Sequence, residues 1–215
     1  MGTMLSLESR EEREAGLEEA CEVLRRGGLV AFPTETFYGL AADPRRDDAL
    51  MRLFAVKRRS PERPLLLLLP SREHVDGYAA RIPPSAQRLM DRFWPGGLTL
   101  VFEALPSVSP LLTAGTGTIG LRLSSRPLAV DLARRFGSAV TGTSANPSGL
   151  PPACTAREVA ASLACEPALI LDGGPTPGGA GSTVLDVTSD PPRILREGQV
   201  SREALAACLS PLVPS

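Results

Sequence analysis

The sequence contains very few of the residues that usually build metal sites and nucleophilic active sites. It has one histidine, His74, and four cysteines, none of which form a Cys-x-x-Cys pair. A recognisable zinc pattern is therefore missing, and a Ser-His or Cys-His mechanism could use only His74. A Gly-x-Ser-x-Gly motif is also missing, so a nucleophile of the α/β-hydrolase type is not indicated.

Long apolar runs are missing as well. The five leucines at 65–69 are far too short for a membrane span, and the first residues lack a basic segment followed by an apolar one. The cysteine spacing suggests neither a disulfide framework nor a metal site, which favours reduced thiols. The sequence therefore predicts a cytoplasmic protein without a membrane span.

Lysine and asparagine each occur once, as Lys57 and Asn146, and every other basic residue among the 23 lysines and arginines is an arginine. Arginine does not replace lysine where a compact point charge is needed. Lys57 and Asn146 are therefore candidates for a specific chemical task. The alternative is that each is an accident of composition.

Charge is balanced overall but clustered locally. The net charge is −1 and the pI about 6.0, with 43% hydrophobic and 22% charged residues, which is ordinary for a globular protein. At 215 residues, the chain fits one large domain or two small ones. Between residues 52 and 63 the only lysine is joined by four arginines. This cluster indicates a local anion site.

Apolar periodicity and turn residues predict a mixture of helices and strands. Helices are expected at 11–26, 47–57, 84–93, 126–136, 155–163 and 201–209. Strands are expected at 29–32, 65–69, 98–102, 118–123, 139–141, 168–171, 182–187 and 193–196. Several strands follow one another without an intervening helix, so we expect an α+β fold with a mixed, twisted sheet flanked by helices. The Gly/Pro-rich stretch 173–181 is expected to be a functional loop.

A hydroxyl-rich segment follows the first expected strand. Residues 32–40 read Phe-Pro-Thr-Glu-Thr-Phe-Tyr-Gly-Leu, with hydroxyls at Thr34, Thr36 and Tyr38. Such groups at a strand end can orient a small polar ligand in a cleft. The alternative is a threonine-rich turn whose β-branched residues continue the sheet.

A second motif, Lys57-x-Arg59 with Arg63 further on, places cations where an expected helix ends. A triphosphate is the natural occupant of such a pocket. The alternative is a solvated basic turn at the negative end of the helix dipole. Pro64 and the five leucines follow at once, which keeps these charges close to the core.

Two stretches of small residues would let main-chain amides approach a phosphate. In residues 141–149, Ser144 and Asn146 add side-chain donors. Residues 178–183 read Gly-Gly-Ala-Gly-Ser-Thr, but they lack the Walker lysine and precede a strand, so they are not a P-loop. Taken singly, each stretch is only a turn signal.

Two arginines lie at or near the ends of expected strands, close to glycine. They are Arg122, in Gly-Leu-Arg-Leu, and Arg196, in Ile-Leu-Arg-Glu-Gly. Their position suits bidentate contacts to a carboxylate or a phosphate. In an arginine-rich chain, an ordinary surface arginine is the alternative.

In combination these motifs resemble the YrdC/Sua5 family of threonylcarbamoyl-AMP synthases. The pairs Lys57-x-Arg59 and Ser144-x-Asn146 match the family signature, as does the Gly120-x-Arg122 strand. The strings PTETFYGL, FWPGGLTLV, GSTVLDV and ILREG also match, and the matches run in order from residue 27 to residue 201. The chain is similar to the short, single-domain form of the family, which implies a single YrdC-like domain over 1–215.

The resemblance implies that L-threonine, bicarbonate and ATP are converted to threonylcarbamoyl-AMP and pyrophosphate. This product serves the N6-threonylcarbamoyl modification of adenosine 37 in tRNA, after transfer to the tRNA threonylcarbamoyltransferase complex. Mg²⁺ would arrive with ATP and keep several waters, so neither a tightly bound cofactor nor a metal site of the protein's own is expected. Direct binding of tRNA or double-stranded RNA is a further implied interaction.

The resemblance also implies roles for individual residues. Catalysis would involve Lys57, Arg59, Ser144 and Asn146, with Lys57 as a charge stabiliser on the phosphates or the carbamate. ATP would contact Lys57, Arg59, Arg63, Thr118, Ser144 and Arg196. The threonine pocket would contain Thr34, Tyr38, Arg122, Gly142 and Ser182. Two positions depart from the family pattern: Leu68 stands where some members carry a histidine near threonine, and Ser60 where proline is common.

Two other functions fit parts of the sequence. A non-catalytic module that binds double-stranded RNA or tRNA would need a broad basic face, which a pI of about 6.0 does not favour. A carbamoyl-adenylate-forming domain of the hydrogenase-maturation type shares the Lys-x-Arg and Ser-x-Asn residues. That domain normally lies in a much longer chain with zinc-finger-like cysteines. The sequence therefore favours an adenylate-forming enzyme of the YrdC/Sua5 type.

Overall fold

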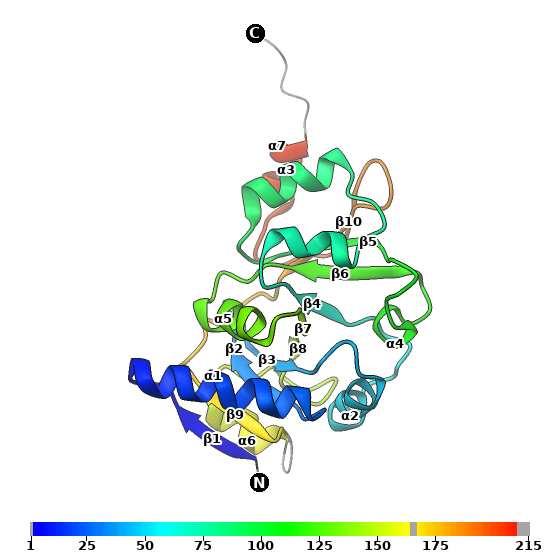
Figure 1. The fold of residues 1–215 in the computed structure, drawn as a ribbon. Coiled ribbons are helices and arrows are strands. Elements are labelled where there is room, and N and C mark those ends of the chain that lie inside the picture. Colours follow the sequence, from blue (N-terminus) through cyan, green and yellow to red (C-terminus); the bar gives the residue numbers. More distant parts are fainter. Residues whose placement is uncertain (1, 164–166, 210–215) are drawn as a thin grey trace.

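The computed structural model describes residues 2–163 and 167–209, and their strands form two mixed sheets (Figure 1). The five-stranded sheet has the order β1 (Thr3–Ser6), β9 (Leu169–Asp172), β2 (Val30–Pro33), β3 (Tyr38–Ala41) and β8 (Thr143–Ser144). The six-stranded sheet has the order β11 (Arg193–Arg196), β10 (Thr183–Asp186), β5 (Leu98–Glu103), β6 (Thr118–Arg122), β4 (Leu66–Leu68) and β7 (Val140–Thr141). Parallel and antiparallel pairs occur in both. The predicted α+β fold is confirmed, with the strands divided between two sheets.

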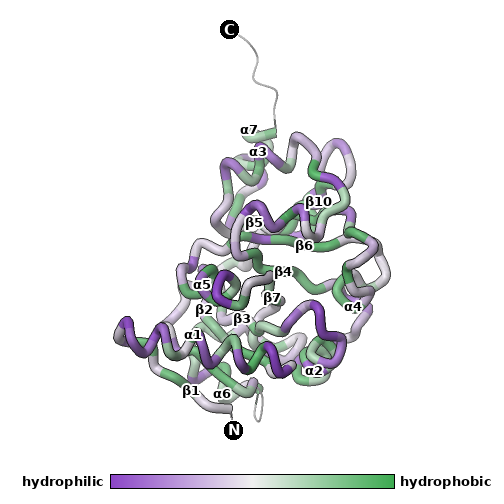
Figure 2. The backbone as a smooth tube through the Cα atoms, viewed as in Figure 1, coloured by the Kyte–Doolittle hydropathy of each residue, from purple (hydrophilic) through white to green (hydrophobic). Residues whose placement is uncertain are grey.

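Helices surround the two sheets. They are α1 (Arg10–Arg25), α2 (Asp47–Lys57), the 3-10 helix η1 (Arg72–Gly77), α3 (Pro84–Phe93), α4 (Pro110–Thr113), α5 (Pro127–Phe136), α6 (Ala156–Leu163) and α7 (Arg202–Leu209). In Figure 1, α1 and α5 lie beside the five-stranded sheet, whereas α3 and α7 lie together at the far end of the six-stranded one. The alternation of polar and apolar residues along α1 is visible in Figure 2.

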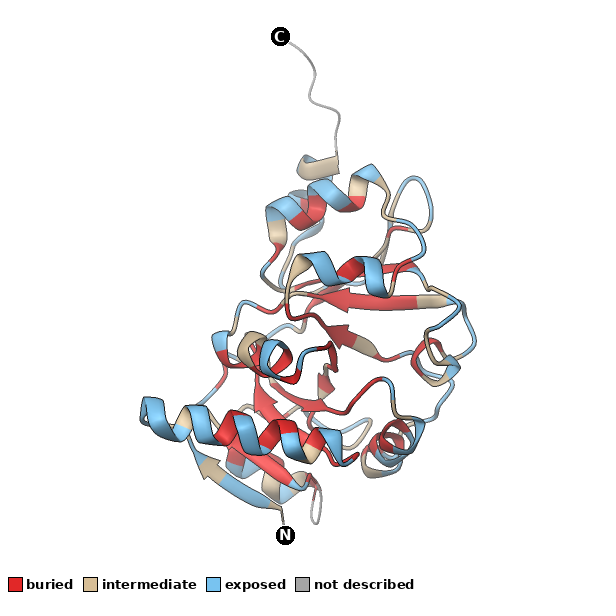
Figure 3. Ribbon diagram, viewed as in Figure 1, coloured by how far each residue is buried: buried red, intermediate tan, exposed pale blue. Residues whose placement is uncertain are grey.

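Strand β2 is buried on both faces, which explains its continuous apolar sequence. Val30 and Phe32 pack with α1 and α5 in one apolar cluster, while Ala31 packs with α6 in the other. Figure 3 shows the central strands of both sheets as buried and the outer faces of the helices as exposed. The five-stranded sheet is therefore a layer between helices.

The leucine run confirms the prediction of a central strand that is apolar on both faces. Leu67 belongs to the cluster that contains α2, whereas Leu68 belongs to the cluster that contains α1 and α5. Both side chains are buried, and β4 pairs with β6 on one side and β7 on the other. Strand β4 thus fixes the segment that follows the basic cluster against the core.

The chain crosses from the six-stranded to the five-stranded sheet at Gly142, between β7 and β8. A side chain at this position would place its Cβ 2.6 Å from Leu66 Cδ1 and 2.7 Å from Leu68 Cγ, so any other residue would require both leucines to move. The Thr141 hydroxyl donates to the Leu40 carbonyl at 2.9 Å and accepts from the Ala42 N–H at 2.8 Å. These bonds connect the two sheets where the Ser144–Asn146 turn begins.

Several elements differ from the sequence-based expectation. The predicted hydroxyl-rich loop is a short turn followed by β3, and the turn after 139–141 contains the two-residue strand β8. The edge strand β1 was not predicted, because its mostly exposed residues lack an apolar alternation. Helix α6 begins with a capping box, in which Thr155 Oγ1 accepts from the Glu158 N–H and the Glu158 carboxylate accepts from the Thr155 N–H, both at 3.2 Å.

Two observations concern the cysteines and the membrane. Cys21, Cys154 and Cys208 are free thiols, and Cys165 lies outside the described residues. Over 2–163 and 167–209, no helix has both the length and the apolar character needed to cross a bilayer.

Candidate active site

A cavity of about 570 Å³ is lined by residues from both sheets and from the turns between them. The motifs that were far apart in the sequence meet here. The predicted site residues on its wall are Thr34, Tyr38, Arg59, Thr118, Arg122, Gly142, Ser144, Asn146, Ser182 and Arg196. Lys57 and Arg63 are not among the lining residues. A cavity of this size and polarity suits a small-molecule ligand.

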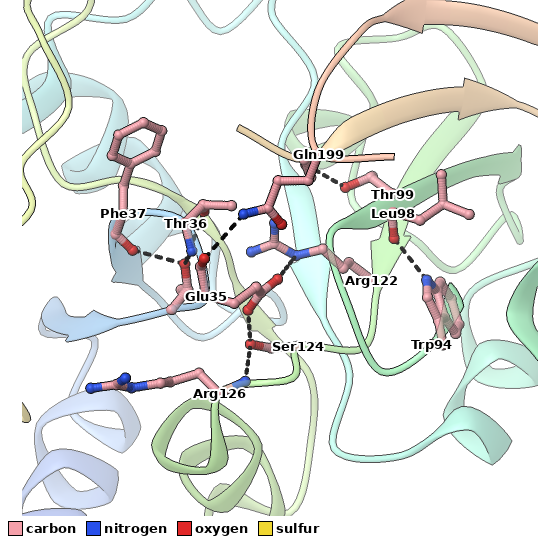
Figure 4. Close-up of polar contacts among 12 residues, drawn as sticks. Glu35, Thr36, Phe37, Trp94, Leu98, Thr99, Arg122, Ser124, Arg126 and Gln199 are labelled. Atoms are coloured by element: carbon pink, nitrogen blue, oxygen red, sulfur yellow. Dashed lines mark hydrogen bonds and ion pairs between the residues drawn. The ribbon is translucent and has the colours of Figure 1, made fainter. Parts of the chain in front are cut away.

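One wall of the cavity holds a buried ion pair between Arg122, at the end of β6, and Glu35 (Figure 4). Arg122 is only 3% exposed, and its Nε lies 3.5 Å from Glu35 Oε1, beyond hydrogen-bond geometry. Burial lowers the pKa of Arg122, and the Glu35 carboxylate opposes this shift. The guanidinium has its charge compensated by a neighbour but keeps hydrogen-bonding capacity for a ligand.

Glu35 was not predicted from the sequence as a site residue. Hydrogen bonds from two other parts of the chain hold it in place. The Ser124 hydroxyl donates to Glu35 Oε2, and the Ser124 Oγ in turn accepts from the Arg126 N–H at 3.2 Å. Gln199 Nε2 donates to the Glu35 main-chain carbonyl at 3.2 Å (Figure 4). Glu35 lies between Thr34 and Thr36 in the 32–40 motif. A carboxylate so close to an expected ligand pocket is the sequence feature from which Glu35 could have been predicted as a site residue.

The hydroxyl-rich turn before β3 is stabilised by its own threonines. Thr34 Oγ1 donates to the Phe37 carbonyl at 2.8 Å, and the Thr34 and Thr36 hydroxyls are 3.1 Å apart. The buried Tyr38 hydroxyl donates to the Gly174 carbonyl at 2.9 Å and lies 3.3 Å from Asp172 Oδ1. Burial and the Asp172 charge raise the pKa of Tyr38, so it stays a neutral donor.

The start of β10 brings Ser182 and Arg196 together at the cavity. Arg196 Nη2 donates to the Ser182 main-chain carbonyl at 2.7 Å and to its hydroxyl oxygen at 3.1 Å. The Ser182 hydroxyl also lies 2.9 Å from Thr99 Oγ1 on β5, a second residue that the sequence did not predict. The short loop before β10 is thereby fixed to β11, with a cation at the rim.

The three arginines that follow Lys57 in the basic cluster have different environments. Arg59 lines the cavity, and its Nη2 donates to the Pro64 carbonyl at 2.8 Å, while burial lowers its pKa. Arg58 is the exposed C-cap of α2, with a left-handed φ of 48°. Arg63 is exposed and adds to the positive potential near Arg59. Of the three arginines, only Arg59 is placed on the cavity wall.

Lys57 lies beneath the cavity wall. It is 1% exposed, and its Nζ donates to the main-chain carbonyls of Ser144 and Asn146, the latter at 2.7 Å. The burial of Lys57 could have been predicted from helical periodicity, because Lys57 follows Leu50 and Leu53 on the buried face of α2. The only lysine is therefore bonded to the turn that contains the only asparagine.

Four buried side-chain atoms have no hydrogen-bond partner in the described part of the chain, and all belong to this region. They are Glu35 Oε1, Arg59 Nε, Arg122 Nε and Asn146 Oδ1. Buried polar groups are normally paired, so unpaired ones call for an explanation. Three of these residues line the cavity, which makes a polar ligand the natural partner. Within the described ranges, histidine, cysteine, aspartate and glutamate form no group of three or more that could hold a metal ion.

The environment of Lys57 leads to a prediction about stability. Burial, with a further contribution from the Arg59 charge, lowers the pKa of Lys57 to about 7. An unfolded lysine keeps its proton to about pH 10.4, so between these values the unfolded chain binds more protons. The free energy of unfolding of the unmodified protein, relative to Lys57→Met, should therefore rise with pH above 7, by at most about 1.4 kcal/mol per pH unit.

Urea unfolding of both proteins between about pH 7 and pH 9 measures this difference. The comparison cancels groups that both proteins share, such as Cys21, whose thiol pKa is raised by burial. A difference that stays constant or falls with pH would contradict a buried lysine with a depressed pKa.

Comparison with known proteins shows which sequences and structures this chain resembles. The family model for Sua5, YciO and YrdC, described as telomere recombination, matches residues 22–198. A Bacillus subtilis relative named threonylcarbamoyl-AMP synthase is 39% identical over 91% of this chain and 57% of its own length. A Mycobacterium tuberculosis relative is 37% identical over 93% of this chain and 91% of its own length.

The fold agrees with these sequence matches. The solved structure of Pyrococcus abyssi Sua5 complexed with L-threonine superposes with a TM-score of 0.92, at 35% identity, over 96% of this chain and 61% of the other. The chain thus spans a little over half of the B. subtilis and P. abyssi proteins and nearly all of the M. tuberculosis one. From the match over most of its length, the chain belongs to the Sua5/YciO/YrdC family.

Proposed function

We propose that this protein is an enzyme that forms threonylcarbamoyl-AMP and pyrophosphate from L-threonine, bicarbonate and ATP. The observation that carries the proposal is the convergence of the family motifs on one cavity whose wall holds three arginines and unpaired polar groups. The names of the relatives support the product, and the P. abyssi complex supports L-threonine as a ligand.

The reaction needs charge stabilisation and positioning more than acid-base side chains. Bicarbonate supplies CO₂ and hydroxide, and the threonine amine attacks the CO₂ to form a carbamate. The proton that the amine loses combines with the hydroxide to form water. A carbamate oxygen then attacks the α-phosphorus of ATP, and the bond to the bridging oxygen of pyrophosphate breaks. Such a transfer is catalysed by alignment of the reacting atoms and by preorganised donors and cations. The cavity suits it, because it is rich in arginines and hydroxyls.

We assign the nucleotide to the part of the cavity with Arg59, Arg196, Ser144 and Asn146. Arg59 and Arg196 supply positive charge near developing phosphate charge, and Thr118 lies on the same wall. Asn146 Oδ1 and Arg59 Nε are the unpaired groups that a ligand would satisfy. Mg²⁺ enters with the triphosphate as part of the substrate and keeps most of its waters.

The amino acid is assigned to the part with Arg122, Thr34, Ser182, Tyr38 and Gly142. Arg122 binds the threonine carboxylate, since its charge is buried and its Nε lacks a hydrogen bond. Thr34 and Ser182 line the same cavity, and we assign the side-chain hydroxyl of threonine to this polar part of it. Leu68, which replaces a histidine of some family members, is buried in the core and is not among the lining residues. We therefore assign recognition of the side-chain hydroxyl of the threonine substrate to the Thr34 turn and the start of β10.

In the cell, we place the protein in the cytoplasm as a nucleotidyltransferase of tRNA modification. Its product passes to the transferase complex that completes N6-threonylcarbamoyladenosine at position 37 of tRNA. A non-catalytic RNA-binding role is less consistent with a net charge of −1 and with the three arginines that line one cavity.

Threonine-dependent release of pyrophosphate tests the proposal. The protein is incubated with ATP, Mg²⁺ and bicarbonate, and pyrophosphate is measured with and without threonine. We expect release only when all four are present. Equal release without threonine, or no release at all, would show that the assignment is wrong.

Amino-acid selectivity should follow from the polar lining. A pocket whose hydroxyls pair with the threonine hydroxyl leaves them unpaired when valine binds, so valine should be rejected strongly. Serine lacks only a methyl group, which is worth about 1–3 kcal/mol, so threonine should be preferred over serine only modestly. The measurement is kcat/KM for threonine, serine and valine, before and after Thr34→Val. Equal use of valine and threonine by the unmodified protein would refute the proposed pocket.

A further inference from the structure

The side chain of Lys57 fastens the end of α2 to the turn at 144–148. Its Nζ donates to the Ser144 and Asn146 carbonyls, and its own main-chain carbonyl accepts from the Ser148 N–H at 2.7 Å. Lys57 is 1% exposed and does not line the cavity. The helix end and the turn are therefore joined by three hydrogen bonds, all involving a main-chain group of the turn.

The turn that Lys57 holds carries two side chains on the cavity wall, Ser144 and Asn146. Asn146 Nδ2 donates to the carbonyls of Pro147 at 2.9 Å and Leu150 at 2.7 Å. These bonds fix the orientation of the amide and leave Asn146 Oδ1 as a buried acceptor without a partner in the described residues. The turn is thus stabilised by hydrogen bonds from the Lys57 side chain and by hydrogen bonds from the side chain of its own residue Asn146.

A direct contact between Lys57 and a nucleotide would require the ammonium to leave both carbonyls. That movement would remove the lysine bond from the Asn146 carbonyl and leave the Ser144 carbonyl with only the Asn146 N–H, at 3.0 Å, which is costly for buried acceptors. The two carbonyls require donors that radiate from one small nitrogen at the end of a flexible stem, whereas a guanidinium spreads its five donors over a larger, rigid planar fork. This requirement explains why an otherwise arginine-rich chain retains a lysine at position 57.

We propose that Lys57 is a positioning residue that holds the main chain at 144–146, so that Ser144 and Asn146 face the nucleotide, and that it does not contact the phosphates. The identity of the nucleotide rests on the proposed function. The sequence-based interpretation of Lys57 as a charge stabiliser is thereby replaced by a role exerted through the turn. Arg59, on the cavity wall, carries the phosphate contact.

Hydrogen–deuterium exchange of the ligand-free protein tests the positioning role directly. In Lys57→Met, which removes the donors but keeps an unbranched side chain of similar size, amides in 142–150 should exchange about tenfold faster or more. Peptides from β5 and β6 should be unchanged, which separates a local effect from unfolding. Lys57→Gln, which keeps two uncharged N–H donors on a shorter stem, should exchange more slowly than Lys57→Met. Arg59→Ala should leave exchange in this turn unchanged.

The salt dependence of ATP affinity tests whether Lys57 contacts the phosphates. A cation that contacts the triphosphate contributes to the decrease of affinity with ionic strength. Lys57→Met should therefore bind ATP more weakly but with the salt dependence of the unmodified protein, whereas Arg59→Ala should lose part of that dependence. Unchanged exchange at 142–150, or a reduced salt dependence in Lys57→Met, would each overturn the proposal. Neither measurement requires synthesis of the adenylate, so failure of the proposed function would be detected separately by the pyrophosphate assay.

Discussion

Replacing Arg59 with alanine should lower the rate of threonine-dependent pyrophosphate release by about tenfold to a thousandfold. Arg59 is the cation of the basic cluster that lines the cavity, and its Nε is buried without a hydrogen-bond partner. The remaining Nη2 bond to the Pro64 carbonyl fixes the guanidinium, so little reorganisation is needed when phosphate charge develops. Initial rates at saturating ATP and threonine measure the effect.

Arg58→Ala is the matched control. Arg58 precedes Arg59 directly but is exposed, caps α2 and does not line the cavity. Its removal changes the net charge as much as Arg59→Ala does, yet it should leave turnover close to that of the unmodified protein. Similar losses in both variants would mean that the general positive potential matters and that Arg59 has no special position.

Replacing Arg122 with methionine should lower kcat/KM for threonine by about a hundredfold or more, while the KM for ATP changes little. Arg122 is the buried cation of the amino-acid side, and truncating one partner of a desolvated charge pair typically costs several kcal/mol. Steady-state kinetics with each substrate varied in turn separate the two effects.

The folding of Arg122→Met must be checked, because Glu35 then keeps a buried carboxylate without its ion-pair partner. Arg122→Lys serves as the companion variant, since it retains the positive charge but loses the planar, bidentate geometry. It should fold and still lose threonine affinity. An equal rise in the KM for ATP and for threonine would place Arg122 outside the amino-acid pocket.

The elements that could be predicted from the sequence are those with strong periodicity or an unambiguous end signal. The helix at Pro84–Phe93 has the predicted bounds, and α2 ends at Lys57 as expected. The strand β4 was recognised because it is apolar on both faces. In contrast, β8 has two residues and exists only through pairing with β3, which no local pattern reveals.

The candidate site was predicted at the level of motifs but not of side-chain direction. Arg59, Arg122 and Ser182 reach the common cavity, whereas Lys57 turns to main-chain carbonyls beneath it. Glu35 was not predicted, because its significance depends on Arg122, a residue far along the chain that only the tertiary fold brings near. Charge patterns thus indicated the segment that lies near the cavity, but the tertiary fold decides which of its cations line the cavity wall.

The central claim is tested most directly by following the carbon of bicarbonate into the product. The protein is incubated with ATP, Mg²⁺, L-threonine and either unlabelled or ¹³C-labelled bicarbonate, and the products are separated and identified by mass spectrometry. We predict threonylcarbamoyl-AMP whose mass increases by one unit with the labelled bicarbonate, formed in equal amount to pyrophosphate. An adenylate without the label, or ATP consumption without any adenylate of threonine, would contradict the account.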